Sequence, residues 1–220
     1  MSSIQKLRVL TRELATPEGF DITRHFPESP TVFVRNGQGL VGFGEAARFE
    51  TSGLNRISEL ATAWRDQVEQ SEITDPLQVQ GSGLVGFGSA TFSPDSISNS
   101  VLIIPRIILG TRDGRSWITK ITPEGETEET SDFYSKVISY RDNAKLSFVE
   151  GSMTSAGFLK QAEKAISKIR SGKLKKVVLA REIMAQLPEG FDLRTGLRLL
   201  AKRYPSCWVY SVAGNFGASP

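Results

Sequence analysis

"KVVLARE", residues Lys176 to Glu182, begins a longer run of β-branched and apolar residues that has the length of a strand. Because side chains alternate between the two faces of a strand, Lys176 would share one face with Val178 and Ala180. In that small apolar row a lysine is desolvated, which lowers its pKa, and only a neutral lysine accepts a proton from water. The letters "KLKK", residues 173–176, also fit an exposed basic turn after a helix, and spacing alone favours this second interpretation.

Helical patterns flank this segment on both sides. Thr154 or Ser155 is placed to cap a helix that ends at Gly172, and its apolar face comprises Phe158, Leu159, Ala162, Ala165, Ile166 and Ile169. Asp192 opens a second helix, which Pro205 closes, with an apolar stripe at Leu193, Leu197, Leu200 and Tyr204. A strand at 206–213, a turn at Gly214-Asn215 and the letters "GASP" complete the chain.

The first 150 residues read as short antiparallel strands separated by turns. Asp113-Gly114 predicts a type I′ hairpin, and the expected strands cover residues 31–35, 39–49, 84–92, 101–109 and 115–121. One helix interrupts them, with Leu54, Ile57, Leu60, Ala61, Trp64 and Val68 on one face. The acidic segment Pro123 to Asp132 predicts an exposed loop, followed by a linker before Gly151. We therefore predict an α+β fold with a strand-rich subdomain at 1–150.

Composition excludes several classes of function. The formal net charge of the 220 residues is +3, and the positive charges are spread along the chain, so nucleic-acid binding is not indicated. We expect no membrane partner and a cytoplasmic protein, because the sequence shows neither a secretion signal nor a membrane-spanning run. His25 and Cys207 are the single histidine and cysteine, so conventional Ser-His or Cys-His chemistry and zinc-finger ligand sets are excluded. Chemistry would have to use Lys, Arg, Asp or Glu.

Several weaker motifs have ordinary structural interpretations. Glycines at 81, 83 and 86 match G-x-G-x-x-G, but the residues after them continue as a strand, whereas a dinucleotide site needs a helix there. His25 is interpreted as a surface or half-buried loop residue, and Cys207 as a small buried one. Arg181 and Glu182 are interpreted as a buried or edge ion pair.

Taken together, these segments resemble a known family. "KVVLARE", the helix before it and "GASP" after it are similar to the chorismate-utilising enzymes, and most closely to isochorismate synthases. "VGFGEAARFE" from Val41 and "VLIIPRIILGTRDGRSWIT" from Val101 are similar to the N-terminal part of bacterial isochorismate synthases. The resemblance implies large antiparallel sheets flanked by helices, incomplete in this chain, with residues 151–220 as the beginning of the chorismate-binding catalytic domain.

The resemblance also implies an activity. These enzymes add water to chorismate at C2 and expel the C4 hydroxyl, with Mg²⁺ holding the ring carboxylate. The lysine at the position of Lys176 is the general base that activates the water, and the acid is a glutamate directly after "GASP". That glutamate and the magnesium ligands lie beyond Pro220, so we expect these 220 residues alone to be inactive. The implied product serves menaquinone or siderophore biosynthesis, and we expect a monomer.

Two other hypotheses stay open. Lys176 favours water over ammonia as the nucleophile, which argues against anthranilate and aminodeoxychorismate synthases. A salicylate synthase, which shares the lysine, is the alternative within the family. An alternative of another class is a non-catalytic truncated or binding fragment.

Overall fold

The computed structural model describes residues 4–16, 18–128 and 146–220. The predicted linker as far as residue 145 and the end of the predicted acidic loop lie outside these residues, and the last three residues before Gly151 form a strand, Phe148–Glu150. The chain forms two compact units: residues 1–140 with 192–220, and residues 141–191. The first unit is discontinuous in sequence, because the last 29 residues of the chain belong to it. No helix in the described part of the chain combines the length and apolarity needed to cross a membrane.

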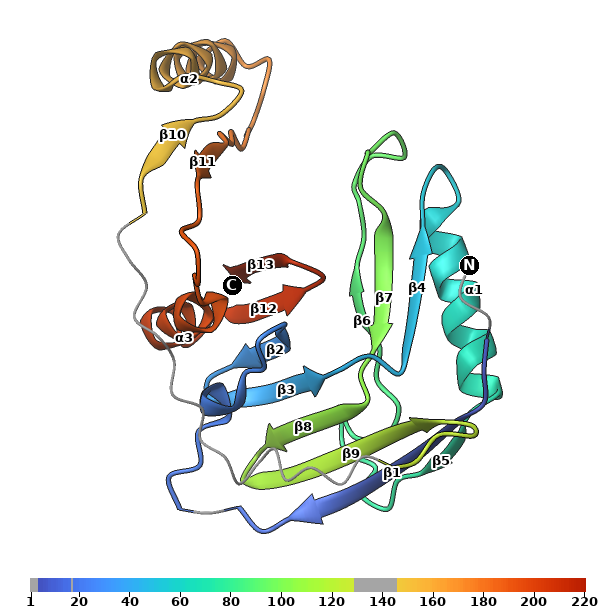
Figure 1. Cartoon of the computed structure of the whole chain (residues 1–220). Coiled ribbons are helices and arrows are strands. Elements are labelled where there is room, and N and C mark those ends of the chain that lie inside the picture. The colour runs from blue at the N-terminus through green and yellow to red at the C-terminus, as the bar shows by residue number, and fades with distance from the viewer. Residues whose placement is uncertain (1–3, 17, 129–145) are drawn as a thin grey trace. The chain divides into compact units, whose positions relative to one another are not determined.

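An eight-stranded sheet forms most of the first unit (Figure 1). Its strand order is β13-β12-β2-β3-β8-β9-β1-β5, and all neighbours are antiparallel except β1 and β5. The strands are β1 (Leu7–Leu14), β2 (Thr31–Arg35), β3 (Gln38–Phe43), β5 (Glu72–Thr74), β8 (Ile107–Arg112), β9 (Arg115–Pro123), β12 (Trp208–Val212) and β13 (Asn215–Ser219). Residues 208–219 thus extend a sheet that the N-terminal residues begin.

A second sheet of three strands forms from β4 (Ala47–Thr51), β7 (Ser100–Ile104) and β6 (Phe87–Ser89). The predictions of single strands over 39–49 and 101–109 were therefore wrong, and the predicted strand 84–92 is reduced to three residues. Each longer run breaks where it passes between sheets, at Gly44 (φ +61°) and at Pro105, which has no N–H to donate. Where the two segments pass from one sheet to the other, they are joined by hydrogen bonds from Arg106 N to Phe43 O (3.0 Å) and from Ala46 N to Ile104 O (2.7 Å).

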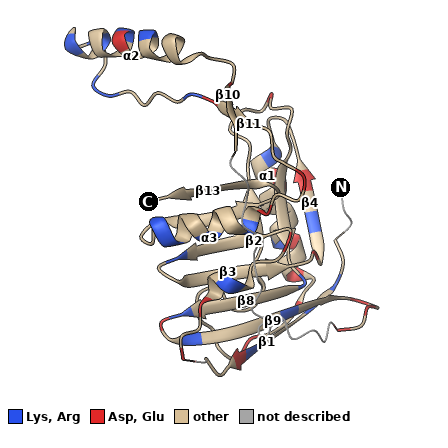
Figure 2. Ribbon diagram, turned by 60° about the vertical axis from the view of Figure 1, so that its left-hand side comes forward, with Lys and Arg blue, Asp and Glu red and all other residues tan. Residues whose placement is uncertain are grey.

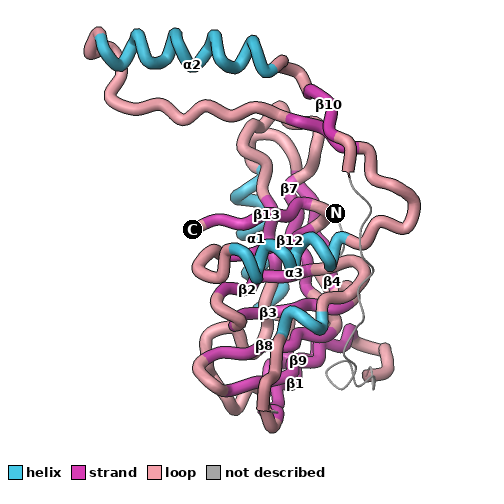
Figure 3. The backbone as a smooth tube through the Cα atoms, turned by 90° about the vertical axis from the view of Figure 1, so that its left-hand side faces the viewer, coloured by secondary structure: helices cyan, strands magenta, loops and turns pink. Residues whose placement is uncertain are grey.

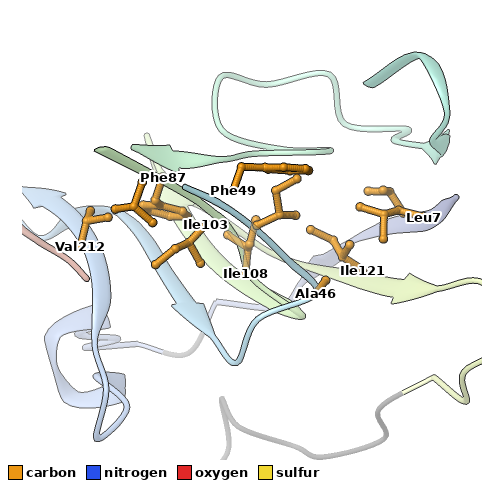
Figure 4. Close-up of a cluster of buried hydrophobic side chains, with 11 residues drawn as sticks. Leu7, Ala46, Phe49, Phe87, Ile103, Ile108, Ile121 and Val212 are labelled. Atoms are coloured by element: carbon orange, nitrogen blue, oxygen red, sulfur yellow. The ribbon is translucent and has the colours of Figure 1, made fainter. Parts of the chain in front are cut away.

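The eight-stranded sheet has a buried core on each face. One core lies toward the three-stranded sheet and includes Leu7, Phe49, Phe87, Ile103, Ile108, Ile121 and Val212 (Figure 4). The other joins Val32, Val34, Val41, Ile107, Leu109 and Val209 to the helices on the opposite face. Strand alternation explains the division, because Ile108 contributes to the first core while its neighbours Ile107 and Leu109 contribute to the second.

Helices cover the outer faces of these cores. α1 (Arg56–Glu69) confirms the predicted helix and packs Leu60, Ala63 and Trp64 toward the first core. Leu54 precedes this helix and is exposed, so the predicted apolar face was too long. The 3₁₀ helix η1 (Ile22–His25) and α3 (Leu193–Arg203) contribute Ile22 and Leu197 to the second core. Asp192 caps α3 as predicted, by accepting a hydrogen bond from Arg194 N.

Three hairpins have the backbone signature of type I′ turns, and the first joins β2 to β3 at Asn36 and Gly37 (φ 51° and 70°). Asp113 and Gly114 both have positive φ (51° and 78°), which confirms the predicted turn between β8 and β9. Ala213 and Gly214 join β12 to β13 in the same way (φ 50° and 80°). This turn lies one residue earlier than the predicted Gly214-Asn215 turn, because alanine takes the first left-handed position.

The second unit contains β10 (Phe148–Glu150), α2 (Ser155–Arg170) and β11 (Ile183–Ala185), and β10 pairs antiparallel with β11. Thr154 caps α2 by accepting a hydrogen bond from Gly157 N at 3.1 Å, as predicted. Gly172 has a φ of 73° and donates its N–H to Ile169 O, which confirms the predicted C-terminal end. Figure 3 shows α2 as the long helix of this unit.

Candidate active site

Lys176 lies on an irregular stretch between α2 and β11. The predicted strand from Lys176 was wrong in its position, since residues 176–182 carry no strand and only Ile183–Ala185 pair with β10. Lys176 is exposed, and its side chain has no hydrogen bond or ion pair within the described part of the chain. The predicted desolvated row is therefore not formed, because Val178 in that row is itself 80% exposed.

The physical reason lies in backbone pairing. A strand needs a neighbour for its N–H and C=O groups, and β10 provides only three residues, all used by β11. No other described strand pairs with residues 176–182. The β-branched residues of this segment favour a strand, but no strand forms because no neighbouring strand pairs with it.

A polar network fixes the far end of this segment to the start of α2. Arg181 donates from Nη1 to the Ser155 hydroxyl and lies 3.5 Å from a carboxylate oxygen of Glu150. The same Glu150 carboxylate accepts the Ser155 backbone N–H at 2.6 Å. Glu182 accepts the Ser152 backbone N–H at 3.2 Å. The predicted Arg181–Glu182 ion pair was therefore wrong, because each side chain pairs with the α2 junction instead.

The network lowers the pKa of Glu150. The largest cause is the hydrogen bond from the Ser155 backbone N–H, followed by the Ser155 side chain, and the Arg181 charge acts in the same direction. Because the folded-state pKa lies below the unfolded value, Glu150 stabilises the fold above the ordinary glutamate pKa, about 4.3. This stabilisation is lost as the pH falls through the lowered folded-state pKa.

Two substitutions at Ser155 separate these causes. Ser155→Pro removes both the hydroxyl and the N–H at the first helical position, where proline is tolerated, and Ser155→Ala removes only the hydroxyl. We expect the proline variant to move the Glu150 pKa closer to its ordinary value than the alanine variant does. Carboxyl chemical shifts followed through a pH titration by NMR measure both. The N–H contribution is the additional change from the alanine variant to the proline variant, and an additional change smaller than that of the alanine variant itself would contradict the assigned order of causes.

Apolar side chains of the second unit are extensively exposed. α2 has no buried residue, although its pattern is amphipathic. The exposed large apolar residues of this unit are Phe148, Val149, Leu159, Ile166, Ile169, Leu174, Val177, Val178, Leu179, Ile183, Met184 and Leu187. Exposed apolar surface on this scale is typical of a surface that another part of a protein covers. The charges on α2 are mainly basic, and only Glu163 among its residues is acidic (Figure 2).

The "GASP" residues lie in the other unit. Gly217, Ala218 and Ser219 belong to β13, which pairs only with β12 among the described strands and forms an edge of the eight-stranded sheet. Ser219 is paired with Trp208, and Pro220 follows the strand. Of the segments that carry the family resemblance, "KVVLARE" thus belongs to the second unit and "GASP" to the first.

The remaining candidate residues have structural roles. His25 is buried, not a surface or half-buried residue as predicted, because η1 turns it inward, where it stacks on Phe20. Cys207 is half-buried before β12. The residues that follow the glycine motif form the short strand β6 (Phe87–Ser89) and no helix, as expected when the dinucleotide interpretation was rejected. The Glu150–Ser155–Arg181 network was missed, because its partners are far apart in sequence.

Candidate metal-binding side chains are dispersed in the part of the chain that the structure describes. His, Cys, Asp and Glu side chains there do not gather in groups of three or more.

Comparison with known proteins identifies the family. The family model described as "chorismate binding enzyme" matches residues 5–220, and the chain belongs to this family. Among solved structures, the chain is similar to MenF, the menaquinone-specific isochorismate synthase from Escherichia coli, with a TM-score of 0.57 and 19% sequence identity. The match covers 98% of this chain and 51% of that one, so the chain spans about half the length of the MenF structure. A search of curated protein sequences found no match.

These findings confirm the predicted fold class. A mixed, sheet-dominated architecture with three α-helices matches half of a chorismate-binding fold. The exposed apolar face of the second unit agrees with a fold whose remaining part is needed to bury it.

Proposed function

We propose that the complete protein carrying this chain is an isochorismate synthase. The observation that carries the proposal is Lys176, a lysine in the "KVVLARE" segment of a chorismate-binding chain, with its amine unpaired in the described structure. A lysine held by an internal ion pair would be poorly suited to act on a substrate. Lys176 has no such partner, and the apolar residues around it would desolvate it once covered.

In the proposed reaction a water oxygen forms a bond to C2 of chorismate and passes a proton to the neutral Nζ of Lys176. The double bonds of the ring shift, the C4–O bond breaks, and the departing hydroxyl takes a proton from an acid. By the family resemblance this acid is a glutamate that follows "GASP". The Arg181–Ser155–Glu150 network would restrain the segment that carries the base. A requirement for Mg²⁺ is inferred from the family resemblance alone.

The test is an assay of the complete gene product with chorismate and Mg²⁺, with product identified by chromatography and mass spectrometry. We expect isochorismate, and we expect the 220 residues alone to form none, because they lack the acid and the magnesium ligands that the resemblance implies. Chorismate that stays unchanged with the complete protein would contradict the proposal. The sequence of the gene beyond the Pro220 codon supplies an independent check, since the proposal expects an open frame that begins with glutamate.

The same assay separates the alternatives. Salicylate with release of pyruvate would identify a salicylate synthase, the second candidate, which the unpaired lysine supports equally. Binding of chorismate without any product would favour a non-catalytic protein. Menaquinone biosynthesis is the proposed use of the product, supported by the similarity to the MenF fold, with siderophore biosynthesis as the alternative.

A further inference from the structure

A groove with a volume of about 350 Å³ runs between α1 and strand β4 in the first unit. On one side it is lined by Phe49, Glu50 and Thr51, three successive residues of β4. Successive side chains of a strand point to opposite faces of the sheet, so the feature that all three residues share is the edge of the strand. The groove therefore follows the edge of β4.

This edge is free of other strands in the part of the chain that the structure describes. β4 is an outer strand of the three-stranded sheet, and its described strand partner is β7. In Figure 1, α1 lies beside β4 on the side away from β7, and the two elements are in contact. An outer strand leaves every second backbone N–H and C=O without a strand partner, and such a row pairs readily with another extended chain. The groove thus offers backbone hydrogen-bonding groups as well as side chains.

The dimensions of the groove suit an extended peptide. Its lining residues on α1 run from Asn55 to Asp66, which spans roughly 16 Å at about 1.5 Å per residue. An extended chain of about five residues has the same length. Ile4, Phe49 and Ala63 supply apolar side chains to the lining. In several peptide-recognition domains, a free strand edge beside pockets for side chains binds a peptide as an additional strand.

The charged groups of the groove select the charge of the peptide. Its carboxylates come from Glu50, Glu59 and Asp66, and its described lining contains no Lys, Arg or His. Glu50 pairs with Arg48 at 2.6 Å, whereas Glu59 and Asp66 form no ion pair within the described residues. These two unpaired carboxylates lie on the groove side of α1, about two turns apart. A basic partner complements them, and an acidic partner is repelled.

We propose that this groove binds an extended basic peptide segment of a partner protein, which adds to the sheet as a strand beside β4. The peptide backbone exchanges hydrogen bonds with the free edge of β4, and its basic side chains lie near Glu59 and Asp66. The exposed carboxylates attract the partner, and the backbone pairing holds it in an extended form. The groove lies in the first unit and Lys176 in the second, so the inference does not rest on the proposed isochorismate synthase activity.

The test measures the fluorescence polarisation of a labelled peptide, acetyl-Lys-Val-Lys-Val-Lys-amide, titrated with the purified complete protein at physiological ionic strength. We expect saturable binding with a dissociation constant of about 0.1–1 mM, since a short flexible peptide loses much freedom when it is ordered. The same peptide with Glu in place of Lys tests the charge and should not bind. The lysine peptide methylated on every backbone nitrogen tests strand pairing and should bind at least about tenfold more weakly. Equal binding of the methylated peptide would overturn the proposal, because it would show adsorption of positive charge without an added strand.

Two double variants locate the binding. Glu59→Gln combined with Asp66→Asn is expected to weaken binding of the lysine peptide about three- to tenfold, since each exposed charge pair contributes little. Glu69→Gln combined with Asp95→Asn is the matched control, because it also removes one exposed glutamate and one exposed aspartate, both outside the groove. This control should bind the peptide as the unaltered protein does. Equal affinities of the two double variants would refute the assignment to this groove.

Analytical ultracentrifugation of the complete protein tests a different occupant, a second copy of the chain that pairs its own β4 with this edge. We expect a monomer to which the lysine peptide binds. A dimer that excludes the peptide would overturn the proposal and assign the groove to a contact between two copies.

Discussion

Replacing Lys176 by alanine in the complete protein is expected to lower isochorismate formation by a factor of about 10² to 10⁴. This is the range that a positioned general base contributes, and here the base would take the proton from the attacking water. The fold should stay intact, because Lys176 makes no hydrogen bond or ion pair within the described residues that the shorter side chain would lose. Turnover with chorismate, together with the thermal midpoint of the variant, measures both parts of this expectation.

Lys175→Ala is the matched control for this experiment. Lys175 is the preceding residue, is also exposed, and carries the same charge, so a general electrostatic effect would lower both activities alike. We expect turnover close to that of the unaltered protein. Near-normal activity in Lys176→Ala would refute the assigned base, and equal losses in both variants would show that positive charge alone matters.

A second large effect is expected on stability from Gly110→Ala. Gly110 in β8 is paired with Trp117 in β9, and the indole ring lies directly over the glycine. A Cβ at residue 110 would overlap atoms Cε2, Cζ2 and Nε1 of Trp117. Trp117 is 1% exposed and its Nε1 donates to Gly81 O at 3.2 Å, so the ring has no free space to move into. Overpacking of this kind costs about 1–3 kcal/mol of unfolding free energy, a substantial fraction of a typical total of about 5–15 kcal/mol.

Gly88→Ala is the control for the glycine effect. Gly88 is also a strand residue, in β6, but the nearest atom to an added Cβ is 3.8 Å away, which is ordinary contact. Here alanine should be neutral or slightly stabilising, because it reduces the freedom of the unfolded chain. Urea unfolding followed by tryptophan fluorescence compares the two variants. Equal midpoints for both would contradict the assigned role of Gly110.

The role predicted for Lys176 stays a prediction, whereas the local structure predicted around it was wrong. Lys176 and "GASP" were identified from short segments that match a family, and the family model confirms the family. The strand expected at Lys176 is absent, because a strand depends on a neighbour and β10 pairs only with Ile183–Ala185. The partners of Arg181 were not predictable, since Glu150 and Ser155 reach it through folding and not through sequence spacing.

The sequence by itself determined the helices, their ends, one hairpin and the family. Thr154, Gly172, Asp192 and the Asp113-Gly114 pair act through local hydrogen bonds and backbone angles, which need no distant partner. Only the tertiary structure decided which strands share a sheet and which apolar faces are covered. The run from Gly39 to Phe49 reads as one strand, yet it is divided at Gly44 because its two parts pair in different sheets. Strand pairing and burial depend on residues distant in sequence, so local patterns do not determine them.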